Sequence, residues 1–285
     1  MRGDETIAVS AVADCVAHVS GIDLASPLTP ARVAQIHAAF ARHPVLVFPD
    51  QDLDPGAIER LGAALGPFGH DPYVMPLDDH AHVIEVRREA RETAPIFGSL
   101  WHSDWSFQAT PPSATVLYGA EVPPVGGDTL FADGYRAFEA LSPVMQDLLA
   151  DLRGVHSAAP SYGPQGLFAR DDASRSMRIV VSAAAEATES HPIVRRHPAS
   201  GRRALFVNHV YTVGIEGMRG DESRALLEFL FKHMTRPEFV YRHRWQSRTL
   251  VMWDNRCVVH YADGGYAGHR RVMYRITLAG ERPCA

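Results

Sequence analysis

A histidine and an aspartate lie two positions apart in the segment LWHSDWSF, which covers residues 100–107. His102 and Asp104 offer an imidazole nitrogen and a carboxylate oxygen, which together suit a borderline divalent metal such as iron, zinc or manganese. If the segment is a strand, these two side chains share one face, and Trp101 and Trp105 pack on the other face as core residues. The pair alone fits a structural hydrogen bond better, so a metal site requires a third ligand from elsewhere in the chain.

The best candidate for the third ligand lies in the segment WDNRCVVHYADGGYAGHRRVMYRITLAG, at residues 253–280. His260 ends a short apolar run of strand type, and a glycine-rich loop and another strand follow it. On that later strand Arg271, Met273 and Arg275 share a face, because side chains alternate along a strand. Two arginines on one face fit a cavity that holds anions better than a dry core.

Four motifs follow one another along the chain: WHSD at 101–104, GGDTLF at 126–131, WDNRCVVHYA at 253–262 and RRVMYR at 270–275. With these motifs the chain resembles the iron(II)- and 2-oxoglutarate-dependent dioxygenases of the taurine dioxygenase family. The resemblance covers most of the chain, from residue 19 to residue 280. It implies a double-stranded β-helix, a form of jelly roll, and an enzyme that consumes 2-oxoglutarate and dioxygen at Fe(II).

The resemblance also assigns roles to individual residues. The catalytic centre that it implies is an Fe(II) ion held by His102, Asp104 and His260. The residues that it assigns to 2-oxoglutarate are Thr129 and Arg271. The residues that it assigns to the substrate are His70, Tyr73, Phe206 and Arg275. A cationic group beside an aromatic wall suits a small anionic substrate.

Taurine or a related sulfonate is the expected substrate, and hydroxylation next to sulfur would release sulfite and an aldehyde. Gly98 departs from the family, in which an asparagine at this position helps to hold the amine of taurine, and residues 157–176 diverge as well. These departures favour an alternative in which the same chemistry acts on an alkyl sulfate, an aryloxy acid or another carboxylate. A third hypothesis is a non-catalytic jelly-roll binding protein with a structural zinc, which leaves the two arginines unexplained.

The elements that must position these residues are mainly strands. From about residue 82, short apolar runs separated by Gly, Pro, Asp and Asn indicate strands. Helices are predicted to begin at Thr29-Pro30, Asp54-Pro55 and Ser142-Pro143, because each pair combines a capping side chain with a proline in the first turn. The long connection at 157–176 indicates an active-site lid or flexible loop. We therefore predict one mainly β domain over residues 1–285, a jelly roll with flanking helices.

Composition limits the partners that this chain can have. The formal net charge of -5 argues against a nucleic-acid partner, and no run of 18 apolar residues indicates a membrane span. Three scattered cysteines and an N-terminus without an apolar signal-peptide core predict a cytoplasmic protein. The expected partner is thus a small anionic substrate. The composition leaves open whether the protein is a homo-oligomer, such as a dimer or tetramer.

Overall fold

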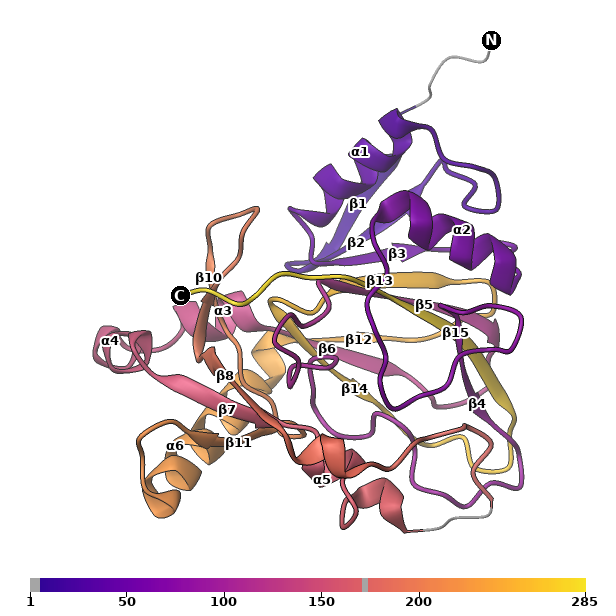
Figure 1. The fold of residues 1–285 in the computed structure, drawn as a ribbon. Helices are drawn as coiled ribbons and strands as arrows, with labels where there is room; N and C mark the ends of the chain where they lie inside the picture. The colour runs from indigo at the N-terminus through magenta and orange to yellow at the C-terminus, as the bar shows by residue number, and fades with distance from the viewer. Residues whose placement is uncertain (1–5, 171–173) are drawn as a thin grey trace.

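The computed structural model describes residues 6–170 and 174–285, and strands form most of its framework (Figure 1). Seven strands form the largest sheet in the order β1-β2-β3-β13-β5-β15-β4. In that order they are β1 (Ala8–Ala13), β2 (Val16–Ser20), β3 (Val45–Phe48), β13 (Leu250–Asp254), β5 (Ala114–Glu121), β15 (Arg271–Leu278) and β4 (Ile84–Arg88). Neighbours pair antiparallel except β2 and β3, which run parallel.

Smaller sheets lie opposite and beside the large one (Figure 1). One is β12-β6-β14, formed by Val240–His243, Thr129–Asp133 and Val258–Ala262. The others are β11-β7-β8 (Thr212–Ile215, Arg153–Ser157, Thr188–Pro192) and β10-β9 (Arg203–Leu205, Val194–Arg196). One buried cluster joins Leu117 and Met273 of the large sheet to Phe131 and Val258 of the small one. The two sheets therefore pack face to face, as in a jelly roll, and the expected mainly β fold is confirmed.

Two of the helices cover the outer face of the large sheet. Helices α1 (Pro30–Phe40) and α2 (Pro55–Leu65) begin as predicted, because Thr29 and Asp54 cap them and a proline starts each one. Their apolar faces join strand residues of the large sheet in one core cluster. The remaining helices are α3 (Gly134–Glu139), α4 (Pro143–Ala150), α5 (Ala159–Tyr162) and α6 (Gly220–Met234). Single 3-10 turns lie at Leu167–Ala169, Ala183–Glu186 and Pro237–Phe239.

The expected strand at WHSD is wrong. His102 makes only an isolated bridge with His260, and a turn follows in which Trp105 has a φ of 46°. This left-handed conformation is rare for a bulky residue. Trp101 and Trp105 therefore do not share a face. Trp101 packs against the cluster around α6, whereas Trp105 is buried in a separate cluster with Tyr73 and Tyr211.

The expected lid is only partly regular. The segment 157–176 contains α5 and the turn Leu167–Ala169, and its residues 171–173 lie outside the described residues. Its role as a lid, like the single domain over 1–285, stays a prediction. Among the described residues, no helix is both long enough and apolar enough to cross a membrane.

A glycine contact fixes the loop that precedes β6. Gly126 has a φ of 67°, and a Cβ atom there would come within 2.5 Å of the carbonyl oxygen of Gly264. The next residue, Gly127, donates its N–H to that same oxygen at 2.8 Å, so the two loops lie in direct contact. Gly127 in turn accepts a hydrogen bond from Arg271, which lies on β15. Only glycine fits this close approach.

We expect Gly126→Ala to destabilise the fold more than Gly201→Ala. Both glycines have a positive φ, at 67° and 68°, but a Cβ at Gly201 would meet nothing within 4 Å. Gly201→Ala should therefore cost only about 1 kcal/mol for the backbone conformation, whereas the added clash should cost Gly126→Ala roughly 1–3 kcal/mol more. Urea unfolding of both variants measures the difference. Equal losses would show that the loop contact does not constrain Gly126.

Candidate active site

A cluster of metal-binding side chains is held together by backbone pairing. The N–H of His102 donates to the carbonyl of His260 at 3.0 Å, and the N–H of His260 donates to that of His102 at 2.7 Å. This bridge joins the loop after residue 98 to the middle of β14 and brings the two imidazole rings to 4.1 Å between centroids. Asp104 Oδ1 lies 3.6 Å from His102 Nε2 and 3.9 Å from His260 Nε2. All three side chains are buried and can point at one ion.

Hydrogen bonds around the cluster orient its donor atoms. His102 Nδ1 lies 2.7 Å from the carbonyl of Leu100, so this nitrogen carries the proton and Nε2 keeps its lone pair for a metal. Asp104 Oδ2 accepts from Thr115 Oγ1 at 2.6 Å, which leaves Oδ1 facing the histidines. Asn255 Nδ2 donates to Thr115 Oγ1 at 2.8 Å, and Asn255 Oδ1 accepts from the N–H of Asp104 at 3.3 Å. Two imidazoles and one carboxylate, positioned in this way, fit a divalent ion such as Fe(II).

The charges of the cluster also suit a metal. Burial alone would raise the pKa of Asp104, but Arg275, His260 and His102 together hold that pKa well below its usual range. Burial, with the neighbouring His102, keeps the pKa of His260 well below its usual value. Asp104 is therefore ionised and His260 neutral, which are the states that metal ligands require.

A narrow cavity extends from this cluster to a buried arginine. It is lined by His102 and His260 at one end and by Thr129 and Arg271 on its wall. The Arg271 guanidinium is buried, and its Nη2 donates to the carbonyl of Gly127 at 3.3 Å while its Nε has no hydrogen-bond partner among the described residues. Burial lowers the pKa of Arg271, partly offset by Tyr266. An arginine buried without a carboxylate partner fits an anionic ligand such as a dicarboxylate.

Thr129 faces the same cavity from the start of β6. Its Oγ1 accepts a hydrogen bond from Trp245 Nε1 at 2.9 Å. Because a hydroxyl is both donor and acceptor, this bond leaves the Thr129 proton free to point at a ligand.

Arg275 lies between two carboxylates. Its Nη2 donates to Asp71 Oδ1 at 2.7 Å, and its Nη1 lies 3.7 Å from Asp104 Oδ1. The guanidinium also lies over the ring of Trp105, 5.0 Å from the centroid. Asp71 and Asp104 raise the pKa of Arg275 against the opposing effect of burial, so the side chain is charged. Asp71 was not among the residues predicted for the site, although it stands beside His70 in the segment FGHDPY.

A wider cavity of about 240 Å³ opens beside the metal cluster. It shares Phe97, Gly98 and His102 with the narrow cavity, so the two are neighbours at the same imidazole. Most of its other lining is apolar or aromatic and includes Tyr162, Leu167, Phe168, Val210 and Tyr211. Within residues 6–170 and 174–285, no carboxylate belongs to the lining. This cavity can therefore hold an apolar group next to the metal.

The other predicted substrate residues do not line either cavity. His70 is exposed, and its carbonyl accepts a hydrogen bond from Gln108. Tyr73 is buried behind the wider cavity and stacks on Tyr162 at 4.7 Å. Phe206 is buried against His156 at 5.7 Å.

A second group of metal-binding residue types, His197, Asp254 and Cys257, is also buried. Its donor atoms are occupied. His197 Nε2 lies 3.0 Å from Asp254, and Nδ1 of the same ring accepts from the N–H groups of Ala199 and Ser200. Arg256 donates to both carboxylate oxygens of Asp254. Burial, with Asp254, raises the pKa of the Cys257 thiol well above its usual value, so it is protonated and packs as an apolar residue.

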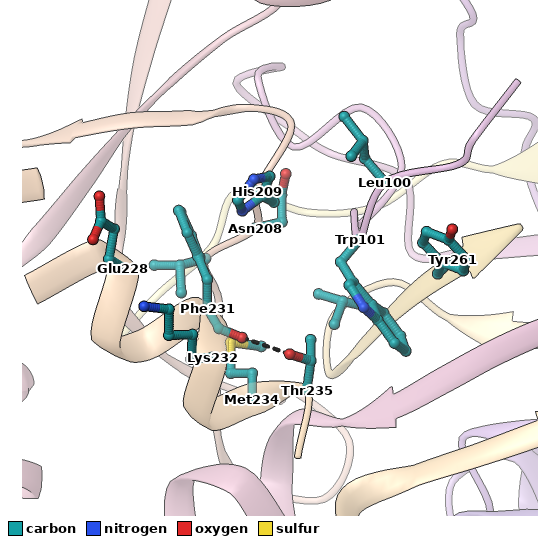
Figure 2. Close-up of a pocket in the computed structure, with 12 residues that line it drawn as sticks. Leu100, Trp101, Asn208, His209, Glu228, Phe231, Lys232, Met234, Thr235 and Tyr261 are labelled. Carbon is teal, nitrogen blue, oxygen red and sulfur yellow. Dashed lines mark hydrogen bonds between the residues drawn. The ribbon is translucent and has the colours of Figure 1, made fainter. Parts of the chain in front are cut away.

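Another cavity, of about 250 Å³, lies between Trp101 and α6 (Figure 2). Trp101 and Tyr261, the sequence neighbours of the two histidines, form one of its walls, and Phe231, Met234 and other residues of α6 form the opposite wall. Neither ligand histidine lines it. This cavity is mostly apolar and is separate from the metal cluster.

Comparisons with known proteins show the family to which this chain belongs. The model of the taurine catabolism dioxygenase TauD, TfdA family matches residues 8–277. The chain belongs to this family. It is 34% identical over 267 residues to an alkylsulfatase of Acinetobacter baylyi, which covers 93% of this chain and 82% of that protein. It is 35% identical to the alpha-ketoglutarate-dependent 2,4-dichlorophenoxyacetate dioxygenase of Cupriavidus pinatubonensis, over 92% of this chain and 93% of that enzyme.

A solved structure gives the same result for the fold. The crystal structure of a taurine dioxygenase from Burkholderia xenovorans matches with a TM-score of 0.80 and 32% sequence identity, over 99% of this chain and 92% of that chain. This TauD/TfdA family protein is therefore a 2-oxoglutarate-dependent dioxygenase that uses Fe(II), 2-oxoglutarate and dioxygen. The hypothesis of a non-catalytic binding protein with a structural zinc is wrong.

We expect His102→Ala, Asp104→Ala and His260→Ala each to weaken Fe(II) binding at least about 100-fold, because each removes one of three donors. Calorimetric titration of the apoprotein with Fe(II) under nitrogen measures this loss. His209→Ala, which removes an exposed histidine that lines the cavity between Trp101 and α6, serves as the control and should bind Fe(II) normally. A variant that kept wild-type affinity would exclude the replaced residue from the metal site.

Arg271→Ala should raise the KM for 2-oxoglutarate at least about tenfold and leave the KM for the second substrate nearly unchanged. The reason is the loss of a charge-assisted contact in a buried site, which costs roughly 2–5 kcal/mol. Arg270→Ala is the matched control, because this neighbour is exposed and pairs with Glu89 and Glu121. Steady-state succinate formation gives both constants. If both KM values rose equally, Arg271 would not be specific for the co-substrate.

Proposed function

We propose that this enzyme hydroxylates a sulfate ester with an apolar alkyl chain at the carbon next to the ester oxygen. In this proposal His102, Asp104 and His260 hold Fe(II), and Thr129 and Arg271 hold 2-oxoglutarate. The observation that carries the substrate class is the wide apolar cavity that opens beside His102. With its cofactors bound, the site supplies the oxidant from dioxygen and 2-oxoglutarate.

The shape of the site supports an anion with an apolar body. An alkyl chain would lie against Phe97, Leu167 and Phe168, where its burial is favourable. A sulfate group would reach toward Arg275, which, like Arg271, lines the narrow cavity beside the metal cluster. In this placement the first carbon of the alkyl chain, which carries the sulfate group, lies next to the metal.

The reaction balances without another reactant. One oxygen atom of dioxygen enters 2-oxoglutarate, which becomes succinate and carbon dioxide. The other is inserted into the C–H bond beside the ester oxygen, and the resulting hydroxylated sulfate ester breaks its C–O bond. The products are an aldehyde and hydrogen sulfate. The chain's own contribution is to hold the sulfate and the alkyl chain so that this C–H bond faces the metal.

Taurine, the substrate that the sequence favoured, fits the cavity less well. Its ammonium group would need a carboxylate or several acceptors, and the residues that the structure describes place no carboxylate in the lining of the wide cavity. Gly98 lines both cavities and offers no side chain to bind an amine. The family assignment agrees with either choice, because the relatives named above include an alkylsulfatase and the matching structure is a taurine dioxygenase.

An aryloxy acid is the second candidate substrate. Four aromatic side chains, Phe97, Tyr162, Phe168 and Tyr211, line the wide cavity and could pack against an aryl ring. One relative acts on 2,4-dichlorophenoxyacetate. His70, Tyr73 and Phe206 remain proposals as substrate residues, although they lie outside the cavity walls. A cytoplasmic location and the oligomeric state remain predictions.

A substrate panel tests the proposal. Hexyl sulfate, hexanesulfonate, phenoxyacetate and taurine are offered at equal concentration, and release of sulfate, sulfite or phenol is measured beside succinate. We expect kcat/KM for hexyl sulfate to exceed that for taurine at least about tenfold, because an apolar cavity leaves a buried ammonium unpaired. Phe168→Ala should lower kcat/KM for hexyl sulfate more than for taurine. A preference for taurine would overturn the proposed substrate class and leave the metal and 2-oxoglutarate assignments unchanged.

A further inference from the structure

Asp71 occupies the anion-binding side of Arg275. Its Oδ1 accepts from Arg275 Nη2 at 2.7 Å and also from the indole N–H of Trp105. Its Oδ2 lies 3.4 Å from Thr277 Oγ1. The side chains of Asp71 and Arg275 are only 11% and 5% exposed, so water has little access to this ion pair. The Arg275 guanidinium is thus already paired before any substrate arrives.

The loop that carries Asp71 is fixed against β15. Gly69 donates its N–H to the carbonyl of Thr277 at 2.8 Å, and a Cβ at Gly69 would come within 2.7 Å of Thr277 Oγ1. Phe68 forms an isolated bridge with Leu278. Asp71 lies two residues after Gly69, so its backbone is held beside β15.

The charges of the site show why this position matters. The chain contributes two buried guanidinium groups, Arg271 and Arg275, and two carboxylates, the buried Asp104 and the partly buried Asp71. Bound Fe(II) and 2-oxoglutarate carry equal and opposite charges and leave this balance unchanged. With Asp71 in place the interior is neutral before substrate binds, and an anionic substrate adds an unbalanced negative charge at low dielectric.

We propose that Asp71 is a specificity-determining residue that competes with the anionic group of the substrate for Arg275. This inference rests on the proposed function, because it requires an anion to bind at Arg275. The sulfate group takes the place of the Asp71 carboxylate on Nη2 of Arg275, and Asp71 turns out of the contact. Anions that bind Arg275 weakly do not displace the Asp71 carboxylate. Substrates must therefore bring enough apolar surface to the wide cavity to offset the loss of the Asp71 contacts.

Asp71→Asn tests this competition. The amide keeps an acceptor oxygen for Arg275 and Trp105 but removes the negative charge. Dissociation constants for hexyl sulfate and for the neutral analogue 1-hexanol are measured by calorimetry on the whole chain loaded with Fe(II) and 2-oxoglutarate, without oxygen. We expect Asp71→Asn to bind hexyl sulfate about tenfold tighter and 1-hexanol with unchanged affinity. Asp78→Asn, an exposed aspartate paired with Arg178 later in the same loop, is the control and should change neither value.

The outcomes separate this inference from the proposed function. Unchanged or weaker binding of hexyl sulfate by Asp71→Asn would overturn the competition while leaving the substrate class in place. Equal tightening of hexyl sulfate and 1-hexanol would also overturn it, since charge would not be the cause. Absence of hexyl sulfate binding in both wild type and variant would overturn the proposed function and this inference together. If Asp71→Asn lowers the unfolding midpoint, Asp71→Ser replaces it, and the same tightening is expected.

Discussion

Two backbone hydrogen bonds between His102 and His260 hold the active site together. They join an irregular loop to a strand of the small sheet and fix the two imidazoles relative to each other. Because neighbouring residues in a paired segment point in opposite directions, the same pairing turns Trp101 and Tyr261 toward α6 and the two histidines toward Asp104. A small displacement of this bridge would move both metal-binding nitrogen atoms at once. The surrounding core clusters, which pack against both sides of the bridge, prevent such movement.

Balanced charge is the second condition that the interior meets. Asp104 is surrounded by Arg275, His102 and His260, and its remaining oxygen is bound by Thr115. Arg271 has no such counterion among the described residues, so its positive charge is available to an anionic ligand. Arg271 and Arg275 lie on the same strand but have different electrostatic surroundings, because only Arg275 is paired with carboxylates. Arg275 pairs with Asp104 and Asp71, and Arg271 supplies a positive charge with no carboxylate partner among the described residues.

Much of this site could be predicted from sequence, for identifiable reasons. The motif residues His102, Asp104 and His260 do come together, and Arg271 and Arg275 do share the cavity side of one strand. The helix starts were predictable because Thr29 and Asp54 are local signals.

The conformation at Trp105 was not predictable, since a positive φ at a tryptophan is imposed by tertiary contacts that no local pattern encodes. Strand β7, with the sequence RGVHS, was not predicted because it contains few apolar residues. Its pairing with β8 and β11 stabilises it as a strand. Asp71 and Asn255 were missed because their roles depend on which distant groups they meet.

The walls of the wide cavity and the metal-binding groups come from different parts of the architecture. Leu167 and Phe168 belong to a connection outside the sheets, whereas His260 belongs to a strand and His102 to the bridge beside it. Substitutions, insertions and deletions are tolerated far better in such connections than in paired strands. In this protein the choice of molecule can thus diverge between descendants of one ancestor while the oxidising centre is inherited intact. Substrate range and reaction chemistry are separately heritable traits of the one fold.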